Sequence, residues 1–232
     1  MLNWAARYFP ILRELKQRLA ETDSLLEIGS GSVGIGKFYH APFVSCDINF
    51  PARPNGPMLP VVATAIALPF AERSFDAVVV SDVLEHVPPA QRMDVVREAL
   101  RVARKVAVFG FPAGSLAMKC DQRLAQAYDD CGRKKPVWLQ EHLQYPYPTE
   151  TLFEDVKQEW ALKVRGNENL DLHYWVMRRE MHPIWFRVFG AFLTLLPHTT
   201  EHILRLGDRE PYYRKIVVVQ RQADADLLTA EL

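Results

Sequence analysis

The sequence predicts a doubly wound α/β fold with a mostly parallel sheet, and two observations carry this prediction. Between residues 24 and 111, short apolar runs alternate with segments of helical periodicity, which is typical of consecutive βα units. A glycine-rich stretch, LLEIGSGSVGIG at 25–36, follows the first run directly, as at a strand-to-helix turn that approaches a ligand. The 232 residues suit one domain with a sizeable core.

We expect this single domain to occupy the whole chain, 1–232, in four parts. They are a covering helix at 1–22, a ligand-binding core at 23–112, further helices and the last strands at 113–222, and a frayed acidic tail at 223–232.

Seven apolar runs are predicted to be strands. The run at 75–81, FDAVVVS, is apolar almost throughout, as expected of a strand buried on both faces. A proline-rich turn at 51–60 follows the second run, and Pro112 ends the fifth. The complete set lies at 24–28, 43–48, 61–64, 75–81, 105–111, 161–165 and 216–219.

Helices are predicted at the start of the chain and between the strands. Leu12, Leu15 and Leu19 recur at helical spacing, so we expect an amphipathic helix after Pro10. Pro89 lies where a helix can begin ahead of the apolar residues of 95–103. The 50 residues between the last two predicted strands should be mainly helical, as an insertion in the C-terminal half.

Composition excludes several classes of protein. Lysine plus arginine equals aspartate plus glutamate, 28 each, so there is no global basic field, and we expect no nucleic-acid partner. Three scattered cysteines are too few for a disulfide framework or a four-cysteine zinc site. The N-terminal segment lacks the pattern of a signal peptide, and no apolar run reaches about 18 residues. We therefore expect a cytoplasmic protein.

The glycine-rich stretch predicts a ligand site whose nature depends on Glu27. Glycines at 29, 31 and 34 allow the backbone to approach a ligand, and their spacing also fits a dinucleotide. Glu27 ends the first predicted strand, where a carboxylate would repel a pyrophosphate but suit the cationic S-adenosylmethionine. The alternative is that Glu27 caps the following helix.

Asp47 is the second acidic candidate. It follows Gly29 by 18 residues at the end of the second predicted strand, close to the spacing at which an acid binds a ribose diol. Such a charge-assisted hydrogen bond contributes roughly 1.5–3 kcal/mol when it is desolvated. Both cofactors contain ribose, so Asp47 does not separate them, and a simple turn aspartate is the other interpretation.

A third stretch, ALPFAERSFDAVVVSDVLEHV at 67–87, completes a pattern. Together with the acidic-glycine motif and Asp47, it resembles the class I S-adenosylmethionine-dependent methyltransferases, and the type 11 group in particular, over 25–111. The resemblance implies a Rossmann-like methyltransferase fold of seven strands, the last antiparallel, and S-adenosylmethionine as cofactor. It also implies in-line transfer of the methyl group to an oxygen or nitrogen.

The resemblance also implies the cofactor-binding residues. Asp47 would bind the ribose hydroxyls and Ser81 would close the site near the methyl group. Thr64 stands where the family often has an aspartate that contacts the adenine. The expected set is Glu27, Gly29, Ser30 and Gly31 on the methionine side, Asp47 on the ribose, and Ile48, Thr64, Ala65 and Ile66 along the adenine, with Ser81.

Three residues are candidate catalytic groups near the acceptor. Glu85 and His86 follow the fourth predicted strand on the side where such folds bind ligands, and His86 could accept a proton near neutral pH. His142 lies in the segment 138–148, which could form a lid or acceptor pocket. The alternatives are that Glu85 and His86 support the loop and that 138–148 is ordinary packing. We expect no metal site.

The acceptor itself is predicted only by class, as a small molecule or glycan. The segment 183–197, PIWFRVFGAFLTLLP, is apolar around most of its circumference and too short to span a bilayer. It could be a buried helix, a protein interface or a helix lying against a membrane, and the last would suit a lipid-linked acceptor. Two other functions remain open at this point: a non-catalytic scaffold with this fold, and a nicotinamide-dependent oxidoreductase.

Overall fold

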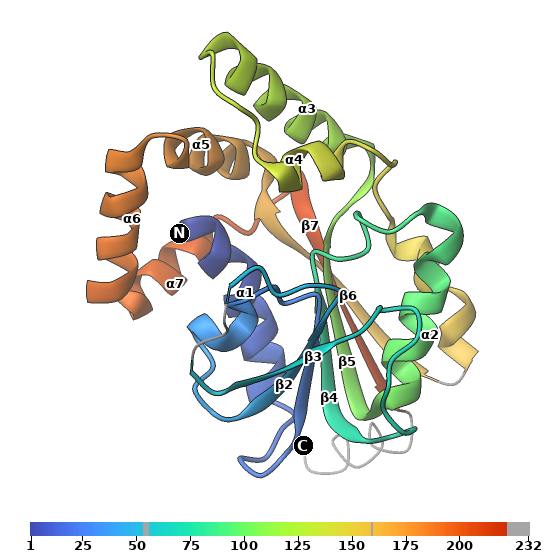
Figure 1. Cartoon of the computed structure of the whole chain (residues 1–232). Coiled ribbons are helices and arrows are strands. Elements are labelled where there is room, and N and C mark those ends of the chain that lie inside the picture. The colour runs from blue at the N-terminus through green and yellow to red at the C-terminus, as the bar shows by residue number, and fades with distance from the viewer. Residues whose placement is uncertain (53–55, 159, 222–232) are drawn as a thin grey trace.

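The computed structural model describes residues 1–52, 56–158 and 160–221, and its centre is one seven-stranded sheet (Figure 1). The strand order is β3-β2-β1-β4-β5-β7-β6. β7 is antiparallel to both of its neighbours, and the other paired strands run parallel, which confirms the predicted fold class. The strands are β1 Leu25–Ile28, β2 Phe43–Asp47, β3 Met58–Val62, β4 Phe75–Ser81, β5 Ala103–Pro112, β6 Trp160–Asn169 and β7 Tyr212–Arg221.

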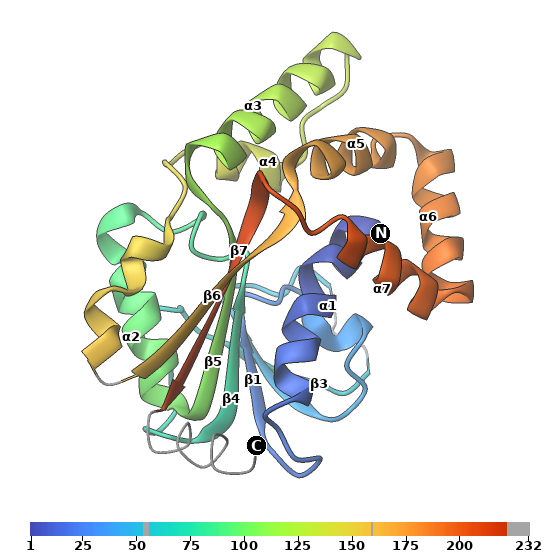
Figure 2. The ribbon, with the colours of Figure 1, turned by 180° about the vertical axis from the view of Figure 1, so that it is seen from behind.

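Helices cover both faces of the sheet and extend beyond one end of it (Figures 1 and 2). The α-helices are α1 Leu2–Lys16, α2 Arg92–Val102, α3 Gly114–Asp130, α4 Val137–His142, α5 Leu170–Glu180, α6 Pro183–Leu195 and α7 Pro197–Leu206. The 3₁₀ turns are η1 Gly34–Lys37, η2 Pro89–Gln91, η3 Glu150–Phe153 and η4 Asp155–Gln158. The predicted helical insertion is thus α5–α7, between β6 and β7.

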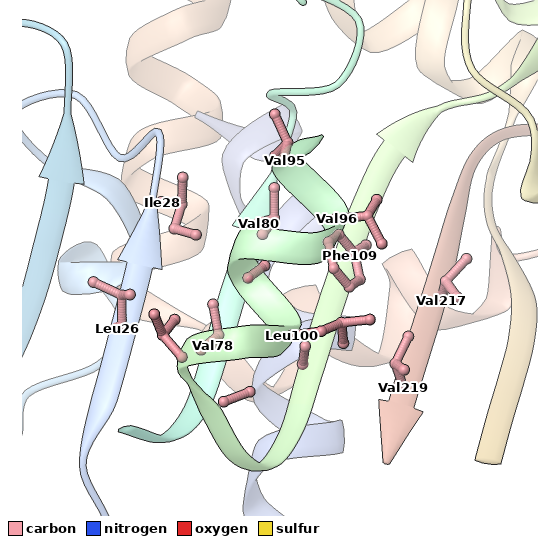
Figure 3. Close-up of a cluster of buried hydrophobic side chains, with 14 of the residues drawn as sticks. Leu26, Ile28, Val78, Val80, Val95, Val96, Leu100, Phe109, Val217 and Val219 are labelled. Atoms are coloured by element: carbon pink, nitrogen blue, oxygen red, sulfur yellow. The ribbon is translucent and has the colours of Figure 1, made fainter. Parts of the chain in front are cut away.

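The two faces of the sheet have separate apolar cores. In β4, Val78 and Val80 pack with α2 residues such as Val96 on one face (Figure 3). Ala77 and Val79 face the other way and belong to the cluster that includes α1. This alternation follows from the two-residue period of a strand, and burial on both sides explains the continuous apolar run of β4.

The last two strands are longer than predicted, and proline is involved in two further boundaries that were predicted wrongly. Helix α1 contains Pro10 instead of beginning after it. An interior proline costs about 3 kcal/mol, but the neighbouring Tyr8 and Ile11 are fully buried against the sheet, and each such side chain regains about 1.5–3 kcal/mol. The third strand begins at Met58 and includes Pro60, because β3 is an edge strand, where a missing N–H is tolerated.

Two further expectations concern the C-terminal tail and membrane-spanning segments. The tail predicted at 223–232 lies outside the described residues. In the described parts of the chain, no helix combines the length and apolar character needed to cross a bilayer.

Candidate functional site

The candidate site lies at the carboxyl ends of β1 and β4, where the strand order reverses direction. Open α/β sheets bind their ligands at such a switch point. The glycine-rich loop follows β1 here, and residues 82–87 follow β4. The two segments touch, because a Cβ added to Gly29 would lie 2.2 Å from Cγ2 of Val83.

The three glycines of the loop serve different purposes. Gly29 is closed in by Val83, and a Cβ on Gly34 would lie 2.1 Å from the Glu27 carboxylate. A Cβ on Gly31 would meet no atom within 4 Å, and its φ of +56° favours glycine. Close approach of a ligand was expected to explain all three, but packing within the chain explains two. Gly31 is the one that borders open space.

The Glu27 carboxylate, which we expected to face the ligand crevice, is buried and bonded to other parts of the chain. It accepts hydrogen bonds from the Tyr8 hydroxyl and from the backbone N–H of Ile35, both at 2.8 Å. Ile35 lies in the first turn of η1, so the contact is the one that the capping interpretation describes. Burial raises the pKa of Glu27 to about 7, against the opposing effect of these donors. Contact with the cofactor stays a prediction, and the observed role is to hold the loop.

Asp47 joins the end of β2 to the same loop. One carboxylate oxygen accepts the N–H of Gly31 at 2.8 Å, and the other accepts that of Asn49 at 3.3 Å. Each oxygen keeps a further acceptor position toward a ligand. The next side chain, Ile48, is 75% exposed, as an apolar contact for an adenine ring would be before the ligand binds.

The adenine-side segment and two serines complete the expected set. The N–H of Ala63 bonds the Asp47 carbonyl at 3.0 Å, which places Thr64, Ala65 and Ile66 beside the end of β2. Ser30 contacts Ser45, a residue that the sequence reasoning missed. The buried Ser81 hydroxyl, at the end of β4, has no hydrogen-bond partner among the described residues.

The three candidate catalytic residues come together beyond β4. The imidazole rings of His86 and His142 are 4.7 Å apart, and Nε2 of His142 lies 3.5 Å from a carboxylate oxygen of Glu85. Burial, together with the charge of Asp82, raises the pKa of Glu85 to about 8. Burial lowers the pKa of His86 to about 4. Burial also opposes a charge on His142, but its hydrogen bond to Asp121 and the charge of Glu85 raise its pKa overall.

Buried charged residues that the sequence did not single out surround this group. Asp121, on α3, accepts hydrogen bonds from His142 at 3.0 Å and Tyr213 at 2.9 Å. Arg214, at the start of β7, pairs with Asp82 and Glu168. The sequence signal for this network was an arginine, Arg214, close to the apolar run 216–219. The partners of Arg214 come from distant elements, so the sequence did not indicate them.

A cavity of about 260 Å³ opens against this network. Its walls come from α1, α4, α5, α6, the start of β7 and the turn after β4. They include Trp4, Arg7, Asp82, Trp138, His142 and Arg214. Trp138 and His142 of the segment 138–148 thus line a cavity, while Leu139 packs in an apolar cluster with Leu124 and Met177, and acceptor binding there stays a prediction.

Comparison with known proteins supports one class of protein for the central part of the chain. Residues 26–111 match the family model described as a methyltransferase domain. This segment holds β1 to β5 with both turns at the switch point, and together with the fold the match supports a class I S-adenosylmethionine-dependent methyltransferase. The match thus indicates S-adenosylmethionine as the cofactor and favours it over a dinucleotide for the glycine-rich stretch.

Solved structures share the fold at low sequence identity. A SAM-dependent methyltransferase from Archaeoglobus fulgidus is 17% identical, with 95% of each chain covered and a TM-score of 0.53. Magnesium protoporphyrin IX methyltransferase from Synechocystis PCC 6803, solved with bound SAH, is 10% identical, with 92% of this chain and 81% of that chain covered and a TM-score of 0.53.

A third structure contains the putative methyltransferase from Haloferax volcanii in complex with the Trm112 activator. It is 12% identical, with 94% of this chain and 90% of that chain covered and a TM-score of 0.55. Comparison with curated protein sequences finds no match.

The residues at the switch point fit this cofactor. Gly31 borders open space, Asp47 retains acceptor positions beside it, and Ile48 presents an exposed apolar side chain. The hydroxyl of Ser81, at the end of β4, is a buried polar group without a hydrogen-bond partner among the described residues.

Proposed function

We propose that this chain transfers the methyl group of S-adenosylmethionine to an oxygen or nitrogen of a small-molecule or glycan acceptor. The observation that carries this proposal is the cavity of about 260 Å³, which is lined by Asp82, the residue directly after β4. The site for the acceptor thus adjoins the end of the strand that contributes Ser81 to the cofactor side.

The size and lining of the cavity favour a small polar acceptor. Its volume lies just below the roughly 300–1,000 Å³ of typical ligand pockets. Aromatic side chains such as Trp4 and Trp138 offer flat apolar walls, while Arg7 and Asp82 offer charged hydrogen-bonding groups. A hydroxylated ring would use both kinds of contact. The balanced net charge gives no support to a nucleic-acid acceptor.

The division of labour follows from the positions of the side chains. When bound, S-adenosylmethionine supplies an electrophilic methyl group on a sulfonium sulfur. Asp47 and the Gly31 loop hold the ribose and methionine side, and Ser81 closes the site. The cavity walls orient the acceptor and exclude water, an effect worth up to about 7–11 kcal/mol in well-aligned reactions. Glu85, His86 and His142 lie on the side from which we propose the acceptor's proton leaves.

Isothermal titration with S-adenosylhomocysteine tests the cofactor part of this proposal, and release of S-adenosylhomocysteine across a panel of small acceptors tests transfer. We expect saturable binding and turnover with at least one hydroxylated or amino acceptor. Binding without turnover, together with a stable protein partner, would favour the scaffold alternative instead. Binding of a nicotinamide dinucleotide in place of S-adenosylhomocysteine would contradict both.

Helix α6 favours a lipid-linked form of the acceptor as a second candidate. Only Phe189 and Leu193 of this helix are buried, so most of the apolar segment 183–197 is on the surface and the buried-helix interpretation is wrong for it. Ile184 and Val188 are exposed, and the partly exposed Phe186 also lines the cavity. We propose that a lipid tail lies along α6 while its head group enters the cavity.

Sedimentation with anionic phospholipid vesicles tests this placement. We expect the wild-type chain to sediment with the vesicles and the double variant Ile184→Ser, Val188→Ser to stay in the supernatant. Leu116→Ser is the matched control, because Leu116 is an equally exposed apolar residue on α3. Equal sedimentation of all three proteins would remove α6 from the proposal.

A further inference from the structure

We propose that Glu85, His86 and His142 bind one divalent transition-metal ion. Each of these residues offers one ligand atom, and the three atoms lie within 4.8 Å of one another. Two of the residues follow β4 and the third ends α4, so the fold assembles the cluster from separate parts of the chain.

Glu85 gives the first argument, because its carboxylate has no hydrogen-bond partner among the described residues, although Nε2 of His142 lies 3.5 Å from one of its oxygens. The side chain is fully buried, and neither of its oxygens accepts a hydrogen bond from the described residues. Buried carboxylates in proteins are normally paired, hydrogen-bonded or bound to a metal. Arg7 and Arg214 are nearby cations, but they bind Asp82 instead. The free oxygens of Glu85 are thus available to an ion.

His142 gives the second argument, because it is already oriented as a metal ligand. Its Nδ1 is 3.0 Å from the Asp121 carboxylate, so an Nδ1–H bond to Asp121 leaves the lone pair of Nε2 free. That Nε2 lies 3.5 Å from a Glu85 oxygen. Two ligands of a tetrahedral ion with bonds of about 2.0–2.1 Å are separated by about 3.4 Å. A carboxylate behind a ligating imidazole is the usual outer partner in such sites.

His86 completes the set and opens it to solvent. Its Nδ1 lies 3.2 Å from a carboxylate oxygen of Glu141, which repeats the carboxylate–imidazole arrangement of Asp121 and His142. The side chain is 29% exposed, so an ion has a path to the cluster. The sequence also places no cysteine in the cluster, which leaves two nitrogens and one carboxylate as its donor set.

This donor set selects the kind of ion. Imidazole nitrogen suits zinc and other first-row transition metals, whereas magnesium and calcium prefer ligand sets made only of oxygen. Three protein ligands leave a coordination position open, as in catalytic zinc sites. If the proposed function holds, this position would bind an acceptor oxygen and favour loss of its proton, since His142 also lines the cavity.

Metal content tests the inference without cofactor or acceptor, so its result is independent of methyl transfer. The untagged chain is treated with chelator, dialysed against Zn²⁺ and then against metal-free buffer, and its zinc is measured by mass spectrometry. We expect close to one equivalent per chain. Replacement of Zn²⁺ by Co²⁺ should give visible d–d absorption bands characteristic of a protein-bound ion.

Three variants assign the ligands. We expect Glu85→Gln and His142→Gln to bind zinc at least tenfold more weakly, while His198→Gln, at an exposed histidine on α7, binds like the wild type. Circular dichroism and thermal melts show that the variants compared are folded, and Glu85→Gln keeps the shape of the side chain. Less than a tenth of an equivalent in the folded wild type, or equal zinc affinity in all four proteins, would overturn the inference.

Discussion

The guanidinium of Arg214 donates two hydrogen bonds to the carboxylate of Asp82, at 3.0 and 2.9 Å, and so joins the start of β7 to the turn after β4. A third bond, at 2.9 Å, runs from the same guanidinium to Glu168. Both carboxylates are almost completely buried. The cavity wall therefore depends on a charge network that is almost completely withdrawn from the protein surface.

Breaking this network should destabilise the fold strongly. We expect Arg214→Met to lower the free energy of unfolding by about 3–5 kcal/mol, because two buried carboxylates each lose a hydrogen-bonded cation, and Asp82 is left with Arg7 alone of its two arginines. Arg104→Met is the control, since Arg104 pairs with Asp76 at a half-exposed position and should cost at most about 1 kcal/mol. Urea denaturation measures both. Equal effects would mean that the buried pair contributes no more than a surface pair.

Loss of the Asp47 charge should weaken cofactor binding. In Asp47→Asn the charge-assisted bond to ribose is lost, and we expect S-adenosylhomocysteine to bind about 10- to 100-fold more weakly by titration calorimetry. Asp94→Asn is the matched control, because Asp94 is an exposed aspartate of α2. Unchanged affinity in Asp47→Asn would remove this residue from the site.

Gly31 and Gly34 should respond differently to alanine. Both have positive φ angles, 56° and 49°, so both variants carry similar backbone strain. Gly31→Ala should fold and lose affinity for S-adenosylhomocysteine, because its new Cβ enters open space at the site. Gly34→Ala should lose more stability in thermal melts, because its Cβ meets the Glu27 carboxylate. The reverse order of stabilities would contradict the packing described for the loop.

Glu27 should make stability fall as the pH rises. Its pKa in the fold is about 7, above the 4.5 of the exposed group, so the folded chain binds the proton more tightly than the unfolded chain does. The resulting stability is fully present below pH 4.5 and is lost as the pH rises through 7, on the order of 3 kcal/mol in total.

Urea denaturation of Glu27→Gln between pH 5 and pH 8 measures this contribution. The variant should lose less stability across that range than the wild type, because glutamine does not titrate while its amide oxygen can still accept the Ile35 N–H. Parallel pH profiles for the two proteins would show that Glu27 titrates normally.

The fold could be predicted because its signals are local. The run 75–81 is apolar almost throughout since β4 is buried on both faces, and the glycine loop follows β1 immediately. Pro10 misled the prediction of α1, because a sequence rule for proline takes no account of the burial of Tyr8 and Ile11.

The sequence indicated individual candidate residues of the site, but it did not predict which of them contact one another in the fold. Asp47 lies next to the glycine loop as expected, whereas Glu27 lies beneath it, because strand position does not determine which neighbour engages a side chain. The grouping of Glu85 and His86 with His142 depends on how α4 packs after α3, which no local pattern encodes. Asp121 and Arg214 have partners from distant elements for the same reason.

Helix α1 supports both halves of the site at once. Arg7 bonds Asp82 on the acceptor side at 2.7 Å, and the adjacent Tyr8 bonds Glu27 beneath the cofactor loop. The proposed acceptor site and the proposed cofactor site therefore both depend on the position of α1. We expect a shift of this helix to change the affinity for the acceptor and the affinity for the cofactor together. By thermodynamic reciprocity, the factor by which the cofactor changes affinity for the acceptor must equal the factor by which the acceptor changes affinity for the cofactor.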